Sequence, residues 1–130
     1  MKKILLVTMA VILLIAGTVY AKGLEVKQKT GDVNVTVTMD KNPPATGINN
    51  LQVDIKDASG KNVTDAKVRV DYSMPAMPGM GAMNYKTDAV LNGQTYAAKL
   101  NISMSGPWNI VVRITKGGKT SSVKFNVDVQ

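Results

Sequence analysis

From Leu24 onward, apolar residues recur at every second position of the chain rather than at every third or fourth. Such alternation puts successive side chains on opposite faces of an extended backbone, as in a β-strand with one buried face. No segment after Ala21 shows a helical stripe of apolar residues, so the pattern favours an all-β fold. The alternating runs predict strands at residues 24–28, 33–39, 51–56, 68–72, 85–91, 96–104, 108–114 and 123–129.

Turn-forming residues stand between these runs. They include Thr30-Gly31-Asp32, Ser59-Gly60, Asn92-Gly93, Ser105-Gly106-Pro107 and Gly117-Gly118. Asn92-Gly93 is the strongest hairpin signal, because both residues tolerate the positive φ of a two-residue turn. Seven or eight short strands at this spacing predict an antiparallel, immunoglobulin-like β-sandwich, with a small closed barrel as the alternative. The longer connection at residues 40–49 is expected to cross from one sheet to the other.

The first residues are organised like an export signal. Two lysines at positions 2–3 precede an almost wholly apolar stretch at 4–16, and Val19-Tyr20-Ala21 has the small-residue pattern that precedes cleavage. We therefore expect residues 1–21 to be a signal peptide and residues 22–130 to be one domain, periplasmic or secreted. Extended to Tyr20, the apolar stretch would measure about 26 Å as a helix, so an uncleaved membrane anchor is the alternative.

The composition argues against several classes of function. The chain has no cysteine and no histidine, so it offers neither a thiolate nor an imidazole base. It also lacks a nucleophile elbow and a phosphate-binding glycine loop, so we expect no enzyme and identify no small-molecule substrate. The formal charge is +7, but the lysines are scattered and often adjoin acids, as in Lys56-Asp57. With one Trp and one Phe, this pattern indicates a solvated surface rather than nucleic-acid binding.

An uncharged run of ten residues is the segment that β structure alone does not explain. Within it, every third residue is a methionine: Met74, Met77, Met80 and Met83. Thioether sulfur is soft and suits Cu(I) or Ag(I), whereas Zn²⁺ and Cu(II) favour imidazole and hard ions favour carboxylates. Pro75 and Pro78 bias the run toward polyproline II, which has three residues per turn. That helix would align the sulfurs on one edge with about 9 Å between neighbours.

Three interpretations of this run compete. The methionines bind Cu(I) or Ag(I), provided that Gly79 and Gly81 bend the chain until several sulfurs meet one ion. Alternatively, they cap an open end of the sandwich, or they form an adaptable apolar contact with a partner. Met39 and Met104 lie on apolar strand faces and are predicted to be core residues. Trp108 is also predicted as a core anchor, with a cation–π contact to bound Cu(I) as the alternative.

Several short elements are distinctive when they are taken together. They are Gly47-Ile48-Asn49 before Leu51-Gln52-Val53, Asp57-Ala58-Ser59-Gly60-Lys61, Met74-Pro75-Ala76-Met77-Pro78, Gly93-x-x-Tyr96 and Met104-Ser105-Gly106-Pro107-Trp108. This combination resembles the YtkA-like domain family of small exported bacterial proteins, whose pattern is related to that of FixH-type domains. The resemblance covers nearly all of residues 23–130.

The resemblance implies a β-sandwich outside the cytoplasmic membrane. By analogy with metal-handling sandwich proteins, it also implies a role near copper or silver efflux, or near metalloenzyme maturation, with a membrane protein as partner. If the Met-Pro-x-Met element belongs to the family pattern, Met74 and Met77 serve the fold, and Met80 and Met83 are the better ligand candidates. The prediction is thus a soft-metal accessory or chaperone, and the rival is an interaction module that docks on a membrane partner through the same residues.

Overall fold

The computed structural model describes residues 24–130, which fold into antiparallel strands without a helix. In chain order the strands are β1 (Leu24–Thr30), β2 (Val33–Met39), β3 (Gly47–Lys56), β4 (Lys67–Met74), β5 (Met83–Asn92), β6 (Thr95–Ile102), β7 (Gly106–Lys116) and β8 (Lys119–Val129). The predicted all-β fold and its eight strands are confirmed, but β6 ends at Ile102, so the prediction of a strand through Met104 is wrong. The predicted signal peptide at 1–21 lies outside the described residues, and no helix within 24–130 is long and apolar enough to cross a membrane.

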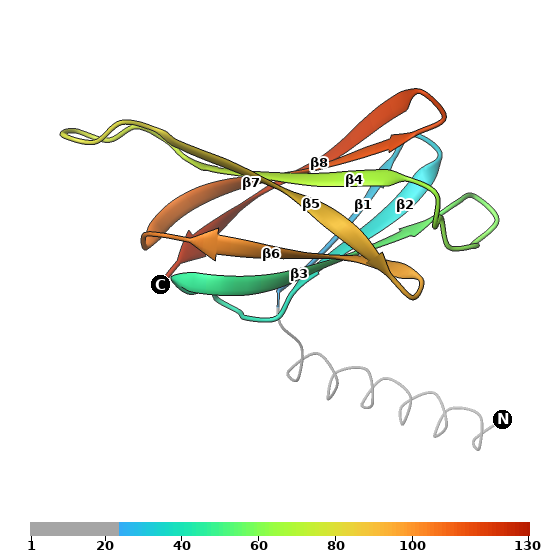
Figure 1. Cartoon of the computed structure of the whole chain (residues 1–130), viewed down its shortest axis with the longest axis horizontal. Helices are drawn as coiled ribbons and strands as arrows, with labels where there is room; N and C mark the ends of the chain where they lie inside the picture. The colour runs from blue at the N-terminus through green and yellow to red at the C-terminus, as the bar shows by residue number, and fades with distance from the viewer. Residues whose placement is uncertain (1–23) are drawn as a thin grey trace, which may run out of the picture.

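Two sheets face each other and share one strand. β1, β2, β3 and β6 follow one another in the first sheet, and β4, β7 and β8 follow one another in the second. β5 belongs to both, because residues 83–89 pair with β4 whereas residues 90–92 pair with β6. Figure 1 shows β5 passing from the layer of β4 to that of β6. The eight strands therefore form one continuous antiparallel sheet with β1 and β8 at its edges. This sheet is folded over into a sandwich.

The core between the layers is filled by the inward-facing residues of the alternating strands. Its largest buried side chains include Trp108, Met39, Leu51 and Ile55. The predictions for Met39 and Trp108 are thus confirmed. Asn49 is the one buried polar residue in the described part of the chain, and its Nδ2 donates to the carbonyl of Ala45 at 2.7 Å. Because the chain has no cysteine, apolar burial and ladder hydrogen bonds must hold this core together.

The predicted β5–β6 hairpin forms with its turn one residue later than expected. Asn92 pairs with Thr95, so the two turn residues are Gly93 and Gln94. Gly93 has a φ of 69°, and a II′ turn requires such a positive φ at its first central position. Glycine alone therefore meets the conformational demand that the sequence pattern had assigned to Asn92 and Gly93 together.

The prediction that residues 40–49 cross between the sheets is wrong. β2 and β3 are direct neighbours in one sheet, so their connection returns to the same layer. Its extra length is used at the end of the sandwich, where Gln130 N donates to the carbonyl of Pro44 at 2.9 Å and Thr46 N donates to the carbonyl of Gln130 at 3.3 Å. The connection thus binds the end of β8. The chain crosses between the two sheets at residues 57–66, along β5 and at residues 103–105.

Tyr96 joins β6 to the connection between β3 and β4. Its hydroxyl donates to the carbonyl of Val63 at 2.9 Å and accepts from the backbone N–H of Ala66 at 3.0 Å. Replacing Tyr96 by phenylalanine would leave both backbone groups without this partner. We expect Tyr96→Phe to lower the free energy of unfolding by about 1–2 kcal/mol in urea denaturation. A change smaller than about 0.5 kcal/mol would show that water replaces the hydroxyl at no cost.

Candidate metal centre

The methionine run forms the end of a long β-hairpin, not a polyproline helix. Met74 ends β4, Met83 begins β5, and the two residues pair. Beyond them, Met77 and Met80 form an antiparallel bridge in which each backbone N–H donates to the other residue's carbonyl, at 2.9 and 2.8 Å. The prediction of a polyproline edge is therefore wrong. We call residues 74–83 the arm, and Figure 1 shows that it projects beyond the rest of the two layers.

The turn at the tip of the arm explains why the hairpin forms. Pro78 and Gly79 are its two central residues, and Gly79 has a φ of 81°. Proline at the first and glycine at the second central position are the preferences of a type II turn, because proline presets its φ and glycine accepts a positive one. Threefold methionine spacing fits this hairpin as well as a polyproline helix, and the Pro-Gly pair decides between them. Gly79 therefore supplies the predicted bend, whereas Gly81 has no positive φ.

The hairpin brings the sulfurs together in pairs. Residues directly opposite each other on antiparallel strands have Cβ atoms about 4.5–5.5 Å apart, whereas polyproline neighbours on one edge would be about 9 Å apart. Met77 faces Met80, and Met74 faces Met83. Each pair of flexible thioethers can therefore reach a common point without a further bend in the backbone.

The four methionines differ in their surroundings. Met74 is a core residue with 1% of its surface exposed, and Met77 and Met83 are partly buried and pack against the core. Met80 is partly exposed beside the turn at the tip. The side chains that solvent and an ion can reach are thus those of Met77, Met80 and Met83, with Met74 beneath them.

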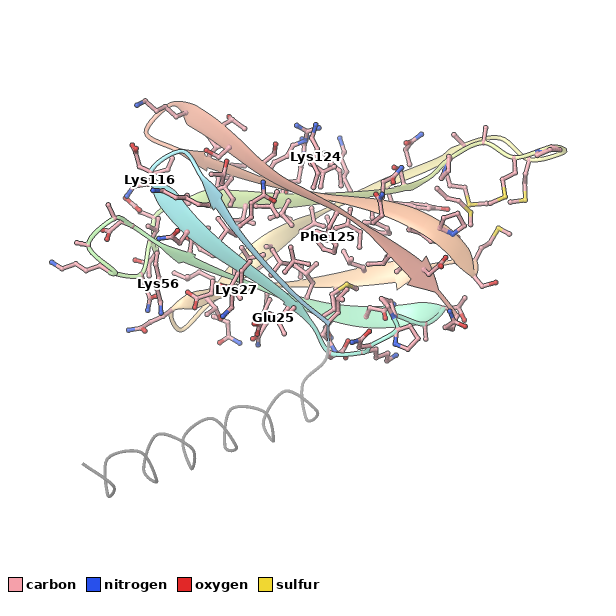
Figure 2. The ribbon with its side chains drawn as sticks, turned by 180° about the vertical axis from the view of Figure 1, so that it is seen from behind. Glu25, Lys27, Lys56, Lys116, Lys124 and Phe125 are labelled. Carbon is pink, nitrogen blue, oxygen red and sulfur yellow. The ribbon has the colours of Figure 1, made fainter. Side chains whose placement is uncertain are left out.

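The connection between β6 and β7 lies against the base of the arm. The hydroxyl of Ser103 donates to the Met83 sulfur, with 3.7 Å between Oγ and Sδ. On the other side of the connection, Gly106 has a φ of 123°, and a Cβ built on it would stand 2.7 Å from Met74 Cε and 4.0 Å from Met77 Cε. Two methionine methyl groups therefore converge on the surface of this glycine. Figure 2 shows sulfur atoms, in yellow, gathered along the arm and next to this connection.

Three aromatic rings continue the apolar surface from the arm into the core. Tyr72 stacks on Tyr85 with 5.4 Å between ring centroids, and each ring lies 6.1 Å from Trp108. Trp108 is fully buried, so an ion would have to enter the core to reach its face, whereas Tyr85 is 42% exposed. Tyr72 and Tyr85 were not singled out from the sequence. Their signal is their equal distance from the Pro78-Gly79 turn, which makes them cross-strand partners.

Within the described residues, acidic side chains do not gather into a metal site. Residues 24–130 contain no group of three or more His, Cys, Asp or Glu side chains that could hold an ion. Burial by itself raises the pKa of Asp71, but the hydrogen bond from Arg113 at 2.6 Å and the charge of Arg69 outweigh it and hold that pKa below its ordinary value. The Asp71 carboxylate is therefore already paired, on the outer face of β4 and β7.

A groove lies at the other end of the sandwich. It has a volume of about 810 Å³, and its lining includes Asp32, Asp57, Lys116 and Lys119 but no methionine. In Figure 2, Lys116 lies at the end opposite the arm. The Asp57 carboxylate accepts hydrogen bonds from the hydroxyl of Ser59 and the backbone N–H of Lys61, which lower its pKa. This groove is thus separate from the sulfur cluster and contains no soft donor.

A family model described as YtkA-like matches residues 27–113. The chain belongs to the YtkA-like family. This YtkA-like domain is also similar to the crystal structure of the soluble domain of PmoD from Methylocystis sp. ATCC 49242 (Rockwell), with a TM-score of 0.52 and 14% sequence identity, over 80% of this chain and 96% of that one. At this identity the likeness shows the fold. No curated protein matched the chain.

Proposed function

We propose that this YtkA-like protein is an exported, non-catalytic β-sandwich that binds Cu(I) or Ag(I) through its arm. In this proposal it is periplasmic or secreted and serves as an accessory or chaperone for the ion, alongside a membrane protein of metal efflux or metalloenzyme assembly. The observation that supports the proposal most directly is the pairing of Met77 with Met80 and of Met74 with Met83 across one hairpin. Paired thioethers in an uncharged segment are the ligands that a soft monovalent ion prefers.

The chemistry of thioethers fits an exported site. Methionine sulfur carries no proton at any ordinary pH, whereas thiolate and imidazole ligands must first be deprotonated. Binding through Met77, Met80 and Met83 should therefore persist in acid, where sites built from cysteine or histidine lose their metal. Because the chain has neither cysteine nor histidine, its methionines are its one source of soft donors.

A competition titration with a chromogenic Cu(I) chelator tests this function. We expect the wild-type protein to retain Cu(I) and the double variant Met80→Leu/Met83→Leu to bind it at least about tenfold more weakly, because leucine keeps the apolar bulk but removes the sulfur. Met39→Leu is the matched control, since Met39 is equally flexible but lies in the core with 1% of its surface exposed. No retention by the wild type, or equal affinity in the wild type and the double variant, would refute a metal site in the arm.

The second candidate function is docking on a membrane partner. It is supported by the projection of the arm beyond the sandwich in Figure 1 and by the 42% exposure of Tyr85, which extends the apolar surface. Adaptable methionine surfaces accommodate varied partners. A wild-type protein that fails to bind Cu(I) or Ag(I) would favour this function over the first.

A further inference from the structure

Met104 lies outside the strands and outside the fully buried core. The sequence predicted it at the end of a strand, but β6 ends at Ile102 and Met104 lies in the short connection to β7. It is partly exposed and packs against the core from outside, whereas Met39 is fully enclosed. Besides Met77, Met80 and Met83 of the arm, Met104 is thus the remaining partly exposed methionine within residues 24–130.

Residues on both sides of Met104 lie close to methionines of the arm. Ser103, immediately before it, donates its hydroxyl to the sulfur of Met83. At Gly106, two positions after it, an added Cβ would stand 2.7 Å from Met74 Cε and 4.0 Å from Met77 Cε. Consecutive Cα atoms are only 3.8 Å apart, so Met104 is held close to this cluster.

The backbone of Met104 is fixed independently of the arm. Its carbonyl accepts a hydrogen bond from Trp108 Nε1 at 2.9 Å, and Trp108 is fully buried. The side chain therefore projects from an ordered turn, so it loses little backbone entropy when it binds a ligand. The hydrogen bond from Ser103 engages one sulfur lone pair of Met83, and a thioether has a second one for a metal ion.

We infer that Met104 supplies a further thioether to the soft-ion site, which is then shared between the arm and the β6–β7 connection. This inference rests on the proposed binding of Cu(I) or Ag(I). It adds that the ion joins two segments more than twenty residues apart in the chain, so that binding fastens the arm to the sandwich. It also places the bound ion next to Met104, whose backbone carbonyl accepts the hydrogen bond from Trp108.

Isothermal titration of the purified protein with Ag(I) tests this assignment. We expect Met104→Leu to weaken Ag(I) binding at least about tenfold and Met39→Leu to leave it unchanged. Trp108 is the one tryptophan of the chain, and it hydrogen-bonds to Met104. Ag(I) should therefore change the tryptophan emission of the wild type and of Met39→Leu, and this change should be lost in Met104→Leu.

Wild-type affinity in Met104→Leu would overturn the inference while leaving the arm site intact, whereas absence of Ag(I) binding by the wild type would refute the proposed function itself. If Met104→Leu does not fold, by circular dichroism, the wild type still gives an answer. With methionine methyl groups labelled for NMR, Ag(I) should shift the ε-methyl resonance of Met104 but not that of Met39. A Met104 signal that does not move would likewise overturn the inference.

Discussion

Replacing Trp108 by alanine is expected to lower the free energy of unfolding by about 3–5 kcal/mol. Trp108 is the largest of the fully buried side chains, and its removal leaves a cavity between the two layers. The substitution also removes the ring that Tyr72 and Tyr85 flank, together with the hydrogen bond to the carbonyl of Met104. A domain of this size is typically stable by about 5–15 kcal/mol, so this one change consumes a large fraction of the total.

Denaturation in urea, followed by far-ultraviolet circular dichroism, measures this effect without relying on tryptophan emission. Trp108→Phe is the milder comparison, because it keeps an aromatic ring in the core and loses the Nε1 hydrogen bond and part of the ring volume, at a cost of about 1–3 kcal/mol. A loss below about 1 kcal/mol for Trp108→Ala would contradict the central position of this ring in the core. If the alanine variant does not fold, the phenylalanine variant still measures the combined loss of ring volume and of the hydrogen bond to Met104.

The strands could be predicted from the sequence because their signal is local. A strand such as Val33–Met39 needs one buried face, and the alternation of apolar and polar residues records that face directly. The ends of strands were less well predicted. β3 begins at Gly47, four residues before the predicted start at Leu51, because residues 47–50 pair in the sheet although their sequence does not alternate between apolar and polar residues. The partners of each strand depend on residues far away in the chain, and a local pattern does not contain them.

The shared strand β5 shows this limit clearly. Its residues change partner between Ala89, which pairs with β4, and Val90, which pairs with β6. Because each half has a neighbour on one side only, β5 is largely exposed, and Val90 is 68% exposed. The sequence of β5 looks like that of an edge strand, although the strand lies in the middle of the ladder.

The sequence of the arm predicts a hairpin when more than the spacing of its methionines is considered. About the Pro78-Gly79 turn, each residue of one strand faces one of the same type: Tyr72 faces Tyr85, Met74 faces Met83 and Met77 faces Met80. Mirrored residue types around a Pro-Gly pair indicate a hairpin, whereas a polyproline helix needs no such symmetry. The contacts of the arm with Ser103 and Gly106 could not be predicted, since they depend on how β6 and β7 fold back beside it.

Gly106 is the position where one added methyl group is expected to disturb the arm most. Its φ of 123° lies in a region that L-residues with a side chain rarely adopt, at a cost of about 1–3 kcal/mol. The added Cβ would also stand 2.7 Å from Met74 Cε, well inside the contact distance of about 3.5–4.0 Å between carbon atoms. Met74 Cε is the end of a flexible side chain, but Met74 is 1% exposed, so its shift must be accommodated within the core. We expect Gly106→Ala to lower the free energy of unfolding by about 2–4 kcal/mol.

Gly81→Ala is the matched control within the arm, because Gly81 has no positive φ and an added Cβ there would meet nothing within 4 Å. We expect it to change stability by less than about 0.5 kcal/mol in the same urea denaturation. A double-mutant cycle with Met74→Ala separates the two costs at Gly106, since shortening Met74 relieves the clash but not the backbone strain. Equal stabilities of Gly106→Ala and Gly81→Ala would contradict both the backbone strain and the clash with Met74. If Gly106→Ala costs as much in the Met74→Ala background as in the wild type, the close approach of Met74 to Gly106 contributes nothing to that cost.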